Sequence, residues 1–322
     1  MTKPRLIVTR KLPDAVEDRL KAHFAVALNP SDQPFSQERL VAAMQQGDAI
    51  LPTVSDRIDA QVIEAAGRRR CRIISNFGVG VSNIDLRAAE FAGLPVTNTP
   101  GVLTDATADI AILLMLSVTR RAWEMESMLR AGKWTGFAPA MNLGSGLQGK
   151  VLGIIGMGRI GQAVAERAYF GFGMKIVYVN RSARDLPQLP TATALGTVDE
   201  LMELSDVVSL HAPGGGENSH LIGEAQLKLM KPGAFLINTA RGDLIDERAL
   251  TNALVERRIA GAGLDVFAEE PRVPAVLRRL NNVALLPHLG SATLETRTAM
   301  GMKAADNLIA FFDGKSPPDL VG

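Results

Sequence analysis

The chain has 322 residues, of which 47% are hydrophobic and 21% are charged, so it has ample apolar content for folded cores and is not typical of disorder. At about 150 residues per domain, this length predicts two domains or one large one. The 35 lysines and arginines nearly balance the 34 acidic residues, and this net charge of +1 predicts no binding to nucleic acid or to an acidic membrane.

Cysteine content and apolar stretches narrow the class of protein further. The single cysteine, Cys71, excludes an intramolecular disulfide and a cysteine zinc cluster, and we expect no metal site. The amino terminus has only a short apolar stretch before charge returns, which is too little for a signal peptide. The longest apolar stretch, Ile110 to Val118, is well short of a membrane span. We therefore expect a cytoplasmic protein without a membrane partner.

Short runs of β-branched residues recur along the chain, and each is followed by a turn and a longer segment of helical periodicity. Runs that are apolar on both faces are typical of parallel strands covered by helices on both sides. Their alternation with helices along the whole chain predicts an α/β fold with a doubly wound parallel sheet. The expected strands lie at residues 5–9, 48–53, 72–75, 94–98, 150–156, 175–180, 206–213, 234–240, 261–267 and 282–288.

Pro100 and Gly101 interrupt this pattern and mark a boundary. Residues Thr104 to Arg130 then predict one long helix that is apolar nearly all round, as in a helix buried between domains or subunits. A last helix is expected from Ser291 to Asp313. The pattern leaves open whether this helix returns to the first part of the chain or simply ends the second.

The pattern GxGxxG occurs twice, and only one occurrence has the context that binds a dinucleotide. The first, Gly144 to Gly149, lies before a strand and has no helix after it. The second, with Gly156, Gly158 and Gly161, follows a strand and opens a helix. There the glycines allow a tight turn and close approach of the backbone to a pyrophosphate, while the helix N-terminus presents free N–H groups.

The end of the next strand indicates which dinucleotide is bound. An NAD site has an acidic residue there, about 20 residues after the glycines, to bind the ribose hydroxyls. This chain has the uncharged Asn180, followed by Arg181, which can pair with a 2′-phosphate, and Ser182, which can donate a hydrogen bond to it. We therefore expect NADP(H) to be preferred and NAD(H) to remain possible, although the segment also fits a merely solvated polar loop.

Four histidines are candidates for proton transfer. His23 and His220 are expected in solvent, on a surface helix and in a polar loop. His211 and His288 each end a strand next to a proline, where ligands of a doubly wound sheet bind. We expect His211 to line the cofactor site and His288 to be the candidate acid.

Delivery of a hydride to a ketone builds negative charge on the carbonyl oxygen and needs a proton donor that titrates near neutrality, which suits His288. Glu270 follows the strand at 261–267 and could stabilise the imidazolium and fix its ring. Arg241, at the end of the strand at 234–240, suits bidentate capture of a 2-oxo acid's carboxylate. Each residue alone also fits a surface charge or a loop histidine, but their conjunction at strand ends favours the catalytic interpretation.

Four motifs in order carry a family resemblance. They are GMGRIG (156–161), the stretch Asn238 to Asp246, DVFAEEP (265–271) and LLPHLGSAT (285–293). Together they resemble the D-isomer-specific 2-hydroxyacid dehydrogenase family. The similarity runs essentially end to end and includes SNFGVGVSNID and NTPGVLTDATAD in the first third of the chain.

The resemblance implies roles for particular residues. Arg241 would bind the substrate carboxylate and carbonyl, His288 would act as acid and base, and Glu270 would be its partner. The backbone N–H groups of Val79 and Gly80 would help to hold the carboxylate.

The resemblance also implies the organisation of the chain. A split substrate-binding domain, residues 1–100 plus 290–322, would surround an inserted dinucleotide-binding domain, residues 101–289, each of them doubly wound and Rossmann-like. Family members are commonly homodimers, which is consistent with the apolar helix after Pro100.

Within the family, the segment from Asn180 to Ser182 resembles that of NADPH-dependent glyoxylate/hydroxypyruvate reductases. We therefore expect NADPH-dependent reduction of a small 2-oxo acid to the D-2-hydroxy acid. The glycine-rich HAPGGGENSH (211–220) departs from the family, which usually has a Thr-containing loop there. The full set of expected cofactor-binding residues is Gly156, Gly158, Arg159, Ile160, Gly161, Asn180, Arg181, Ser182, His211, Ala212, Pro213, Thr239, Arg241, Asp265, His288 and Gly290.

Two alternatives stay open. Within the same family, the substrate could instead be 2-ketogluconate or an arylpyruvate, which pocket-lining residues would decide. In another class, the chain could be a dinucleotide-sensing binding protein, since the family includes transcriptional corepressors. The complete set of Arg241, Glu270 and His288 weakens the second alternative without excluding it.

Overall fold

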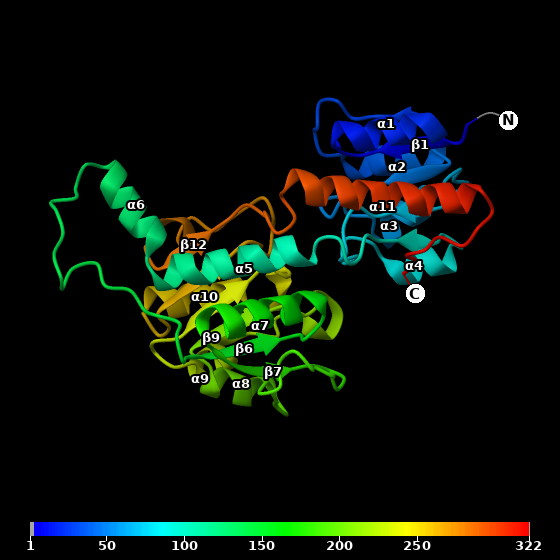
Figure 1. Ribbon diagram of the computed structural model, residues 1–322. Coiled ribbons are helices and arrows are strands. Elements are labelled where there is room, and N and C mark those ends of the chain that lie inside the picture. The colour runs from blue at the N-terminus through cyan, green and yellow to red at the C-terminus, as the bar shows by residue number, and fades with distance from the viewer. Residues whose placement is uncertain (1–2, 322) are drawn as a thin grey trace. The chain divides into compact units, whose positions relative to one another are not determined.

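The chain folds around two separate parallel sheets, each with its own hydrophobic core, and the computed structural model describes residues 3–321 (Figure 1). One unit consists of the chain up to Leu103 together with the segment from Ala292 onward, and the other is Thr104–Ser291. Buried apolar clusters lie on both faces of each sheet. The predicted α/β fold with two doubly wound sheets is confirmed.

The first unit has a five-stranded sheet with the order β2-β1-β3-β4-β5, in which all strand pairs are parallel. Its strands are β1 (Arg5–Val8), β2 (Ala25–Ala27), β3 (Ala49–Leu51), β4 (Ile74–Ser75) and β5 (Val96–Thr97). Its helices are α1 (Asp14–His23), α2 (Gln37–Gln46), α3 (Ala60–Ala65), α4 (Leu86–Phe91) and α11 (Leu294–Phe312). The loops after β4 and β5 lie side by side because these two strands are adjacent and parallel.

The last helix, α11, packs against α1 and β4 of the first unit. Ala304, Ala305 and Leu308 of α11 join the core formed by β1 and α1, and all three are fully buried. Of the two alternatives left open by the sequence, the structure therefore has the helix that returns to the first part of the chain. Burial of this apolar face holds α11 against the first part of the chain. A hydrogen bond from Asn307 Nδ2 of α11 to the Asn98 carbonyl, 209 residues earlier, joins the same two parts.

The second unit has a seven-stranded parallel sheet with the order β12-β11-β10-β9-β6-β7-β8. The strands are β6 (Val151–Ile155), β7 (Lys175–Val179), β8 (Thr193–Ala194), β9 (Val207–Leu210), β10 (Phe235–Asn238), β11 (Gly261–Leu264) and β12 (Val283–Leu285). The direction of winding reverses between β6 and β9, and ligands of such sheets bind at the carboxyl ends of the strands at this point.

Helices cover both faces of the second sheet. α5 (Thr104–Thr119) and α7 (Arg159–Phe172) pack together over one face. The other face is covered by α8 (Val198–Leu204), α9 (Glu224–Leu229) and α10 (Glu247–Val255). The unit also has α6 (Ala122–Arg130) and three 3-10 turns, Gly216–Asn218, Gly242–Leu244 and Leu277–Arg279.

The prediction of a single helix from Thr104 to Arg130 is wrong, because the helical conformation is interrupted between α5 and α6. Arg121 adopts a left-handed conformation with a φ of 56°. The segment returning from α6 ends α5, since Ser145 N–H donates to the Thr119 carbonyl at 2.8 Å. Leu113 of α5 is 48% exposed in the single chain, so burial of this helix between subunits stays a prediction.

Two strands, β2 and β8, were not predicted from the sequence. Both are short and lie at the edges of their sheets, and both residues of β8 are exposed. They lack the apolar character on both faces that marks the central strands. Among residues 3–321, no helix has the length and apolar character required to cross a bilayer.

Candidate active site

The glycine loop at the reversal point of the second sheet follows β6 and opens α7. Gly156 has a φ of 96°, and a Cβ on it would lie 2.6 Å from both the His211 carbonyl carbon and the Ala212 nitrogen. Only glycine therefore allows the loops after β6 and β9 to approach this closely. The predicted motif thus lies where the winding of the sheet reverses.

The amino terminus of α7 fits the pyrophosphate of a dinucleotide. Gly158 precedes the helix and gives it no side-chain cap, and a Cβ at this glycine would meet only open space. Within residues 3–321, no protein group accepts a hydrogen bond from the N–H of Arg159 or Ile160. The helix dipole favours an anion at this position.

The loop after β7 is joined to the glycine loop by Asn180. Its side-chain Oδ1 accepts from the Met157 N–H at 3.0 Å, and its Nδ2 donates to the Ser182 carbonyl at 2.8 Å. Arg181 and Ser182 are exposed to solvent. Asn180 therefore holds two loops together, which the sequence did not indicate. Its Nδ2 also lies 3.4 Å from Ser182 Oγ, which can still donate its own hydrogen to a ligand.

The loop after β9 contains His211 and the glycine-rich segment at residues 211–220. Burial lowers the pKa of His211 to about 3, so this imidazole is neutral, and its Nε2 lies 2.8 Å from Ser209 Oγ. The N–H of Gly215 donates to the Asp243 carboxylate at 2.7 Å. Asp243, which the sequence analysis missed, thus holds the glycine-rich loop next to the segment that carries Arg241.

Arg241 follows β10 and is half-buried. Its Nη1 donates to the Ala240 carbonyl at 2.6 Å, and its own carbonyl accepts from Asn238 Nδ2 at 2.8 Å. Burial lowers the pKa of Arg241, against the charges of Glu270 and Asp243. No carboxylate among residues 3–321 lies within 4.0 Å of this guanidinium.

Gly242 explains how the Arg241 loop reaches the segment after β11. A Cβ on Gly242 would lie 2.0 Å from the Phe267 carbonyl carbon, so a larger residue would separate the two backbones. Phe267 lies three residues before Glu270 and donates its N–H to Glu270 Oε1 at 3.1 Å. The close contact therefore joins the segment of Arg241 to that of Glu270.

Glu270 and His288 form a direct pair. The Oε2 of Glu270 lies 2.7 Å from the Nδ1 of His288. Burial acts to raise the pKa of Glu270, but the hydrogen bond from His288 and the positive charges of His288 and Arg241 outweigh it, so the pKa of this carboxyl lies below its ordinary value. Glu270 therefore stays ionised and fixes the imidazole ring.

The backbone of His288 is strained, with a φ of 55°, and Asp265 holds it. The fully buried Asp265 carboxylate accepts from the N–H groups of Leu289, at 2.6 Å, and Gly290, at 2.8 Å. The Asp265 carbonyl accepts from the His288 N–H at 2.9 Å. Strain of this kind persists where the surrounding structure enforces it and is common in active sites.

Val79 and Gly80 lie in the first unit, in the loop after β4. Among residues 3–321, no group accepts a hydrogen bond from either N–H. Adjacent unpaired N–H groups are suited to bind an anion.

The buried hydroxyl of Thr239, in the second unit, also lacks a partner in the described part of the chain. No group of three or more potential metal ligands is found among residues 3–321.

Comparison with known proteins gives consistent matches along the whole chain. Residues 112–290 match the family model described as D-isomer specific 2-hydroxyacid dehydrogenase, NAD binding domain. The glyoxylate reductase of Thermococcus litoralis is 45% identical over 99% of this chain and 97% of that protein. The glyoxylate reductase of Aeropyrum pernix is also 45% identical, over 100% of this chain and 96% of that protein.

Solved structures give the same result. The NADPH-dependent glyoxylate/hydroxypyruvate reductase of Sinorhizobium meliloti, in complex with NADP and malonate, has a TM-score of 0.89 and 34% identity, covering 100% of this chain and 97% of that one. A glyoxylate reductase from Paecilomyes thermophila has a TM-score of 0.87 and 34% identity, covering 100% and 99%.

The Glu270–His288 pair predicts a pH-dependent contribution to stability. Because the pKa of Glu270 in the folded protein lies below its ordinary value, the pair stabilises the fold above that value, about 4.3, and the contribution is lost as pH falls through the folded-state pKa. Glu270→Gln should therefore lower Tm at neutral pH, and its difference from wild type should shrink in acid. Thermal melts between pH 7 and pH 3 measure this, with the exposed Glu269→Gln as the control. A Tm difference that does not change with pH contradicts the assignment.

Proposed function

The chain belongs to the family of D-isomer-specific 2-hydroxyacid dehydrogenases, and we propose that it reduces a small 2-oxo acid, glyoxylate or hydroxypyruvate, to the 2-hydroxy acid, which is of the D series where the product is chiral. The observation that carries this proposal is the half-buried Arg241, which has no carboxylate within 4.0 Å among residues 3–321, together with the Glu270–His288 pair on the adjacent segment. A partly desolvated cation without a directly bonded anion is unfavourable, and a substrate carboxylate would supply that bond.

The side chains suit this reaction in the following way. NADPH, when bound, supplies the hydride for the carbonyl carbon. Arg241 binds the carboxylate and the carbonyl oxygen, orients the substrate and stabilises the negative charge that develops on that oxygen. His288 gives a proton to the same oxygen through the ring nitrogen that does not face Glu270, which completes the hydroxyl group. Glu270 stabilises the imidazolium and keeps the ring oriented.

The first unit supplies a second set of donors for the substrate. The free N–H groups of Val79 and Gly80 bind the carboxylate. Glyoxylate is favoured over larger 2-oxo acids because full-length relatives at about 45% identity are named glyoxylate reductase. Hydroxypyruvate is favoured because the Sinorhizobium meliloti structure at 34% identity is named a glyoxylate/hydroxypyruvate reductase.

The acid is tested by His288→Asn, because asparagine tolerates the left-handed backbone at this position better than alanine does. Turnover should fall by about a hundredfold or more, as expected when a general acid is removed. The measurement is the loss of absorbance at the reduced nicotinamide band with a panel of 2-oxo acids, and the exposed His220→Asn is the control. Near-wild-type turnover of His288→Asn would rule out the assignment. Faster wild-type turnover of 2-ketogluconate or an arylpyruvate would change the substrate, not the reaction.

NADP(H) is the preferred cofactor in this proposal, with NAD(H) possible. Asn180 is occupied by the Met157 N–H and the Ser182 carbonyl, so the exposed side chains of Arg181 and Ser182 meet the 2′-phosphate. The N–H groups of Arg159 and Ile160 bind the pyrophosphate next to Gly156, Gly158 and Gly161. The other expected cofactor contacts, His211, Ala212, Pro213, Thr239, Asp265 and Gly290, stay predictions.

Arg181→Ala tests the cofactor preference, alone and together with Asn180→Asp. Each variant should raise the KM for NADPH and shift the ratio of kcat/KM values toward NADH, by about tenfold for the loss of one charged pair with the phosphate. Asp at position 180 retains an acceptor for the Met157 N–H, so the glycine loop should keep its conformation. The exposed Arg87→Ala of the first unit is the control. An unchanged ratio in both variants contradicts the preference for NADP(H).

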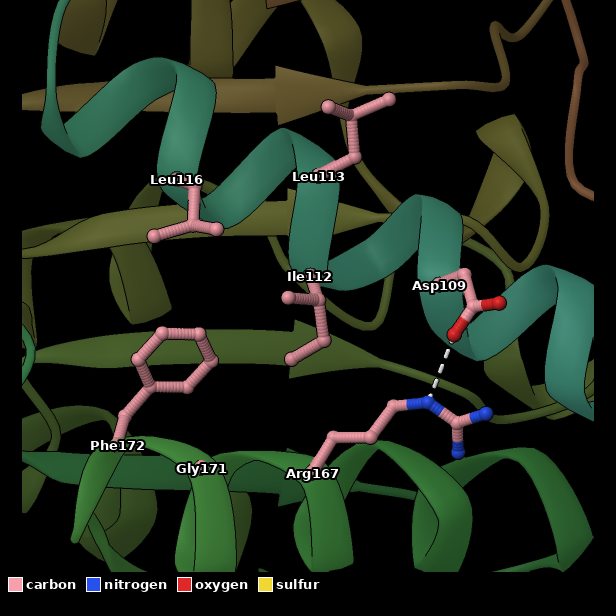
Figure 2. A pocket seen from close by; sticks show the side chains of 7 residues that line it. All are labelled: Asp109, Ile112, Leu113, Leu116, Arg167, Gly171 and Phe172. Carbon is pink, nitrogen blue, oxygen red and sulfur yellow. Dashed lines mark hydrogen bonds and ion pairs between the residues drawn. The ribbon is translucent and has the colours of Figure 1, made fainter.

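The partner in this proposal is a second copy of the chain. A groove of about 550 Å³ lies between α5 and α7 and is lined by Ile112, Leu113, Leu116 and Phe172. Figure 2 shows these side chains with the Arg167–Asp109 pair at one end. The segment from α6 to residue 143 extends away from the sheet of its own unit (Figure 1) and exposes several large apolar side chains. They are Trp123, Leu129, Trp134, Phe137, Met141 and Leu143. Two such apolar surfaces on one chain are complementary in a homodimer.

Leu113→Asp tests the homodimer. A charge in the groove should convert the dimer into a monomer in sedimentation velocity experiments, because a buried unpaired carboxylate is strongly unfavourable. The matched control is Leu204→Asp on α8, since Leu204 is 45% exposed and Leu113 is 48% exposed. A wild-type chain that sediments as a monomer at micromolar concentration would refute the dimer.

The cytoplasmic location expected from the sequence stays a prediction.

A further inference from the structure

In the loop after β4, three consecutive carbonyl groups each accept a hydrogen bond from another part of the first unit. The Gly78 carbonyl accepts from the Thr99 N–H at 3.1 Å. The Val79 carbonyl accepts from Asn98 Nδ2 at 2.8 Å, and the Gly80 carbonyl accepts from Asn76 Nδ2 at 3.0 Å. Three separate donors thus fix three successive peptide groups of this short loop.

A peptide group is planar, and its C=O and N–H point in opposite directions. When Thr99 and Asn98 hold the carbonyls of Gly78 and Val79, the N–H groups of Val79 and Gly80 must face the other way. Neither N–H has an acceptor within residues 3–321. The donors to these carbonyls, the Thr99 N–H and Asn98 Nδ2, therefore determine the direction of the free N–H groups.

The two asparagines are themselves held in place. Asn76 is fully buried, and its Oδ1 accepts from Asn83 Nδ2 at 3.2 Å, which turns its own Nδ2 toward Gly80. The backbone of Asn98 follows β5 and bonds to two other segments. Its N–H donates to the Asp319 carbonyl at 3.2 Å, and its carbonyl accepts from Asn307 Nδ2 at 3.2 Å. The side chain of Asn76 and the backbone of Asn98 are therefore each held by groups outside the loop from Gly78 to Gly80.

We infer that Asn98, assisted by Asn76, is a positioning residue for the substrate carboxylate. It acts through the Val79–Gly80 peptide and does not touch the substrate itself. Because the N–H groups are aimed before the substrate arrives, binding does not have to pay for ordering the loop. This inference rests on the proposed function, since it assigns the anion at this loop to a 2-oxo acid.

The test is steady-state kinetics of Asn98→Ala with glyoxylate at saturating NADPH. Loss of the Val79 anchor should raise the KM for glyoxylate about tenfold, as expected for one weakened charge-assisted hydrogen bond, while kcat changes less than about threefold. The inhibition constant of oxalate, an unreactive dicarboxylate, should rise in parallel. The KM for NADPH should not change, because its expected residues lie in the other unit.

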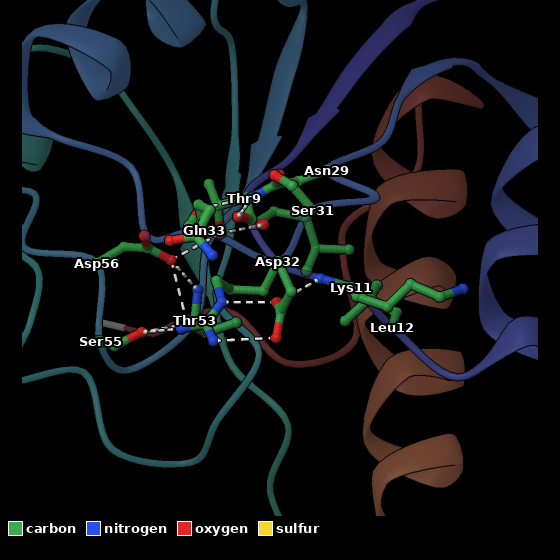
Figure 3. A network of polar contacts seen from close by, with 12 residues as sticks. Thr9, Lys11, Leu12, Asn29, Ser31, Asp32, Gln33, Thr53, Ser55 and Asp56 are labelled. Carbon is green, nitrogen blue, oxygen red and sulfur yellow. Dashed lines mark hydrogen bonds and ion pairs between the residues drawn. The ribbon is translucent and has the colours of Figure 1, made fainter. Parts of the chain in front are cut away.

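The matched control is Asn29→Ala. Asn29 is also in the first unit, and its Nδ2 also donates to backbone carbonyls, Thr9 at 2.7 Å and Gln33 at 2.8 Å (Figure 3). It is nearly fully buried, whereas Asn98 is half-buried and donates to one carbonyl. It belongs to a polar network at the ends of β1 and β3. Asn29→Ala should therefore lower Tm at least as much as Asn98→Ala but leave the KM for glyoxylate within twofold.

Asn98→Asp serves as a second variant if Asn98→Ala does not fold. It keeps the shape of the side chain but replaces the donor by a charged acceptor, so the increase in KM should be larger, and Asn29→Asp is its control. An unchanged KM and oxalate inhibition constant in the folded variants, with active wild type, would overturn the inference.

Failure of the proposed function gives a different result. Wild-type protein that reduces no 2-oxo acid would refute the proposed function alone. Calorimetric binding of oxalate to wild type and variants then decides the inference: weaker binding to Asn98→Ala supports it. Equal binding to both, or no binding to wild type, overturns it.

Discussion

The buried carboxylate of Asp265 is the interaction on which the geometry of the site depends. It lies directly after β11 and accepts the N–H groups of Leu289 and Gly290, which follow β12. These bonds hold His288 in its left-handed conformation, and from that position its ring reaches Glu270. Because a buried carboxylate must be satisfied, Asp265 ties the ends of two adjacent strands together.

The same arrangement recurs at the other functional loops. Asn238 holds the backbone at Arg241, Asn180 joins the glycine loop to the next strand, and Asn98 holds the loop at Val79. In each case a side-chain amide or carboxylate at the end of a parallel strand bonds to the backbone of a loop, its own in the case of Asn238 and a neighbouring one in the others. The groups that could meet a ligand remain unpaired as a result, and they are fixed before the ligand binds.

Much of the fold could be predicted because the signal is local. Apolar runs on both faces mark the central strands, and the glycine motif after Ile155 has a strand before it and a helix after it. Short edge strands such as β2 and β8 escaped prediction because solvent on one side removes that signal. The interruption of the helix at Arg121 could not be predicted, because the group that bonds to the last carbonyl of α5 is distant in sequence. That carbonyl, of Thr119, accepts from the N–H of Ser145, which lies some 24 residues after Arg121.

The sequence by itself determined the class of fold, the dinucleotide motif and the identity of the candidate catalytic side chains, because residue type and position at strand ends suffice for these. Tertiary structure alone decided which of these groups pair and which stay free. His288 meets Glu270 across 18 residues, and Asn98 reaches Val79 across 19. The position of Glu270 after a strand already suggested it as the partner of His288, but nothing in the sequence shows that Asn98 holds Val79. Hydrogen bonds between loops depend on which strands are neighbours in the sheet and not on their separation along the chain.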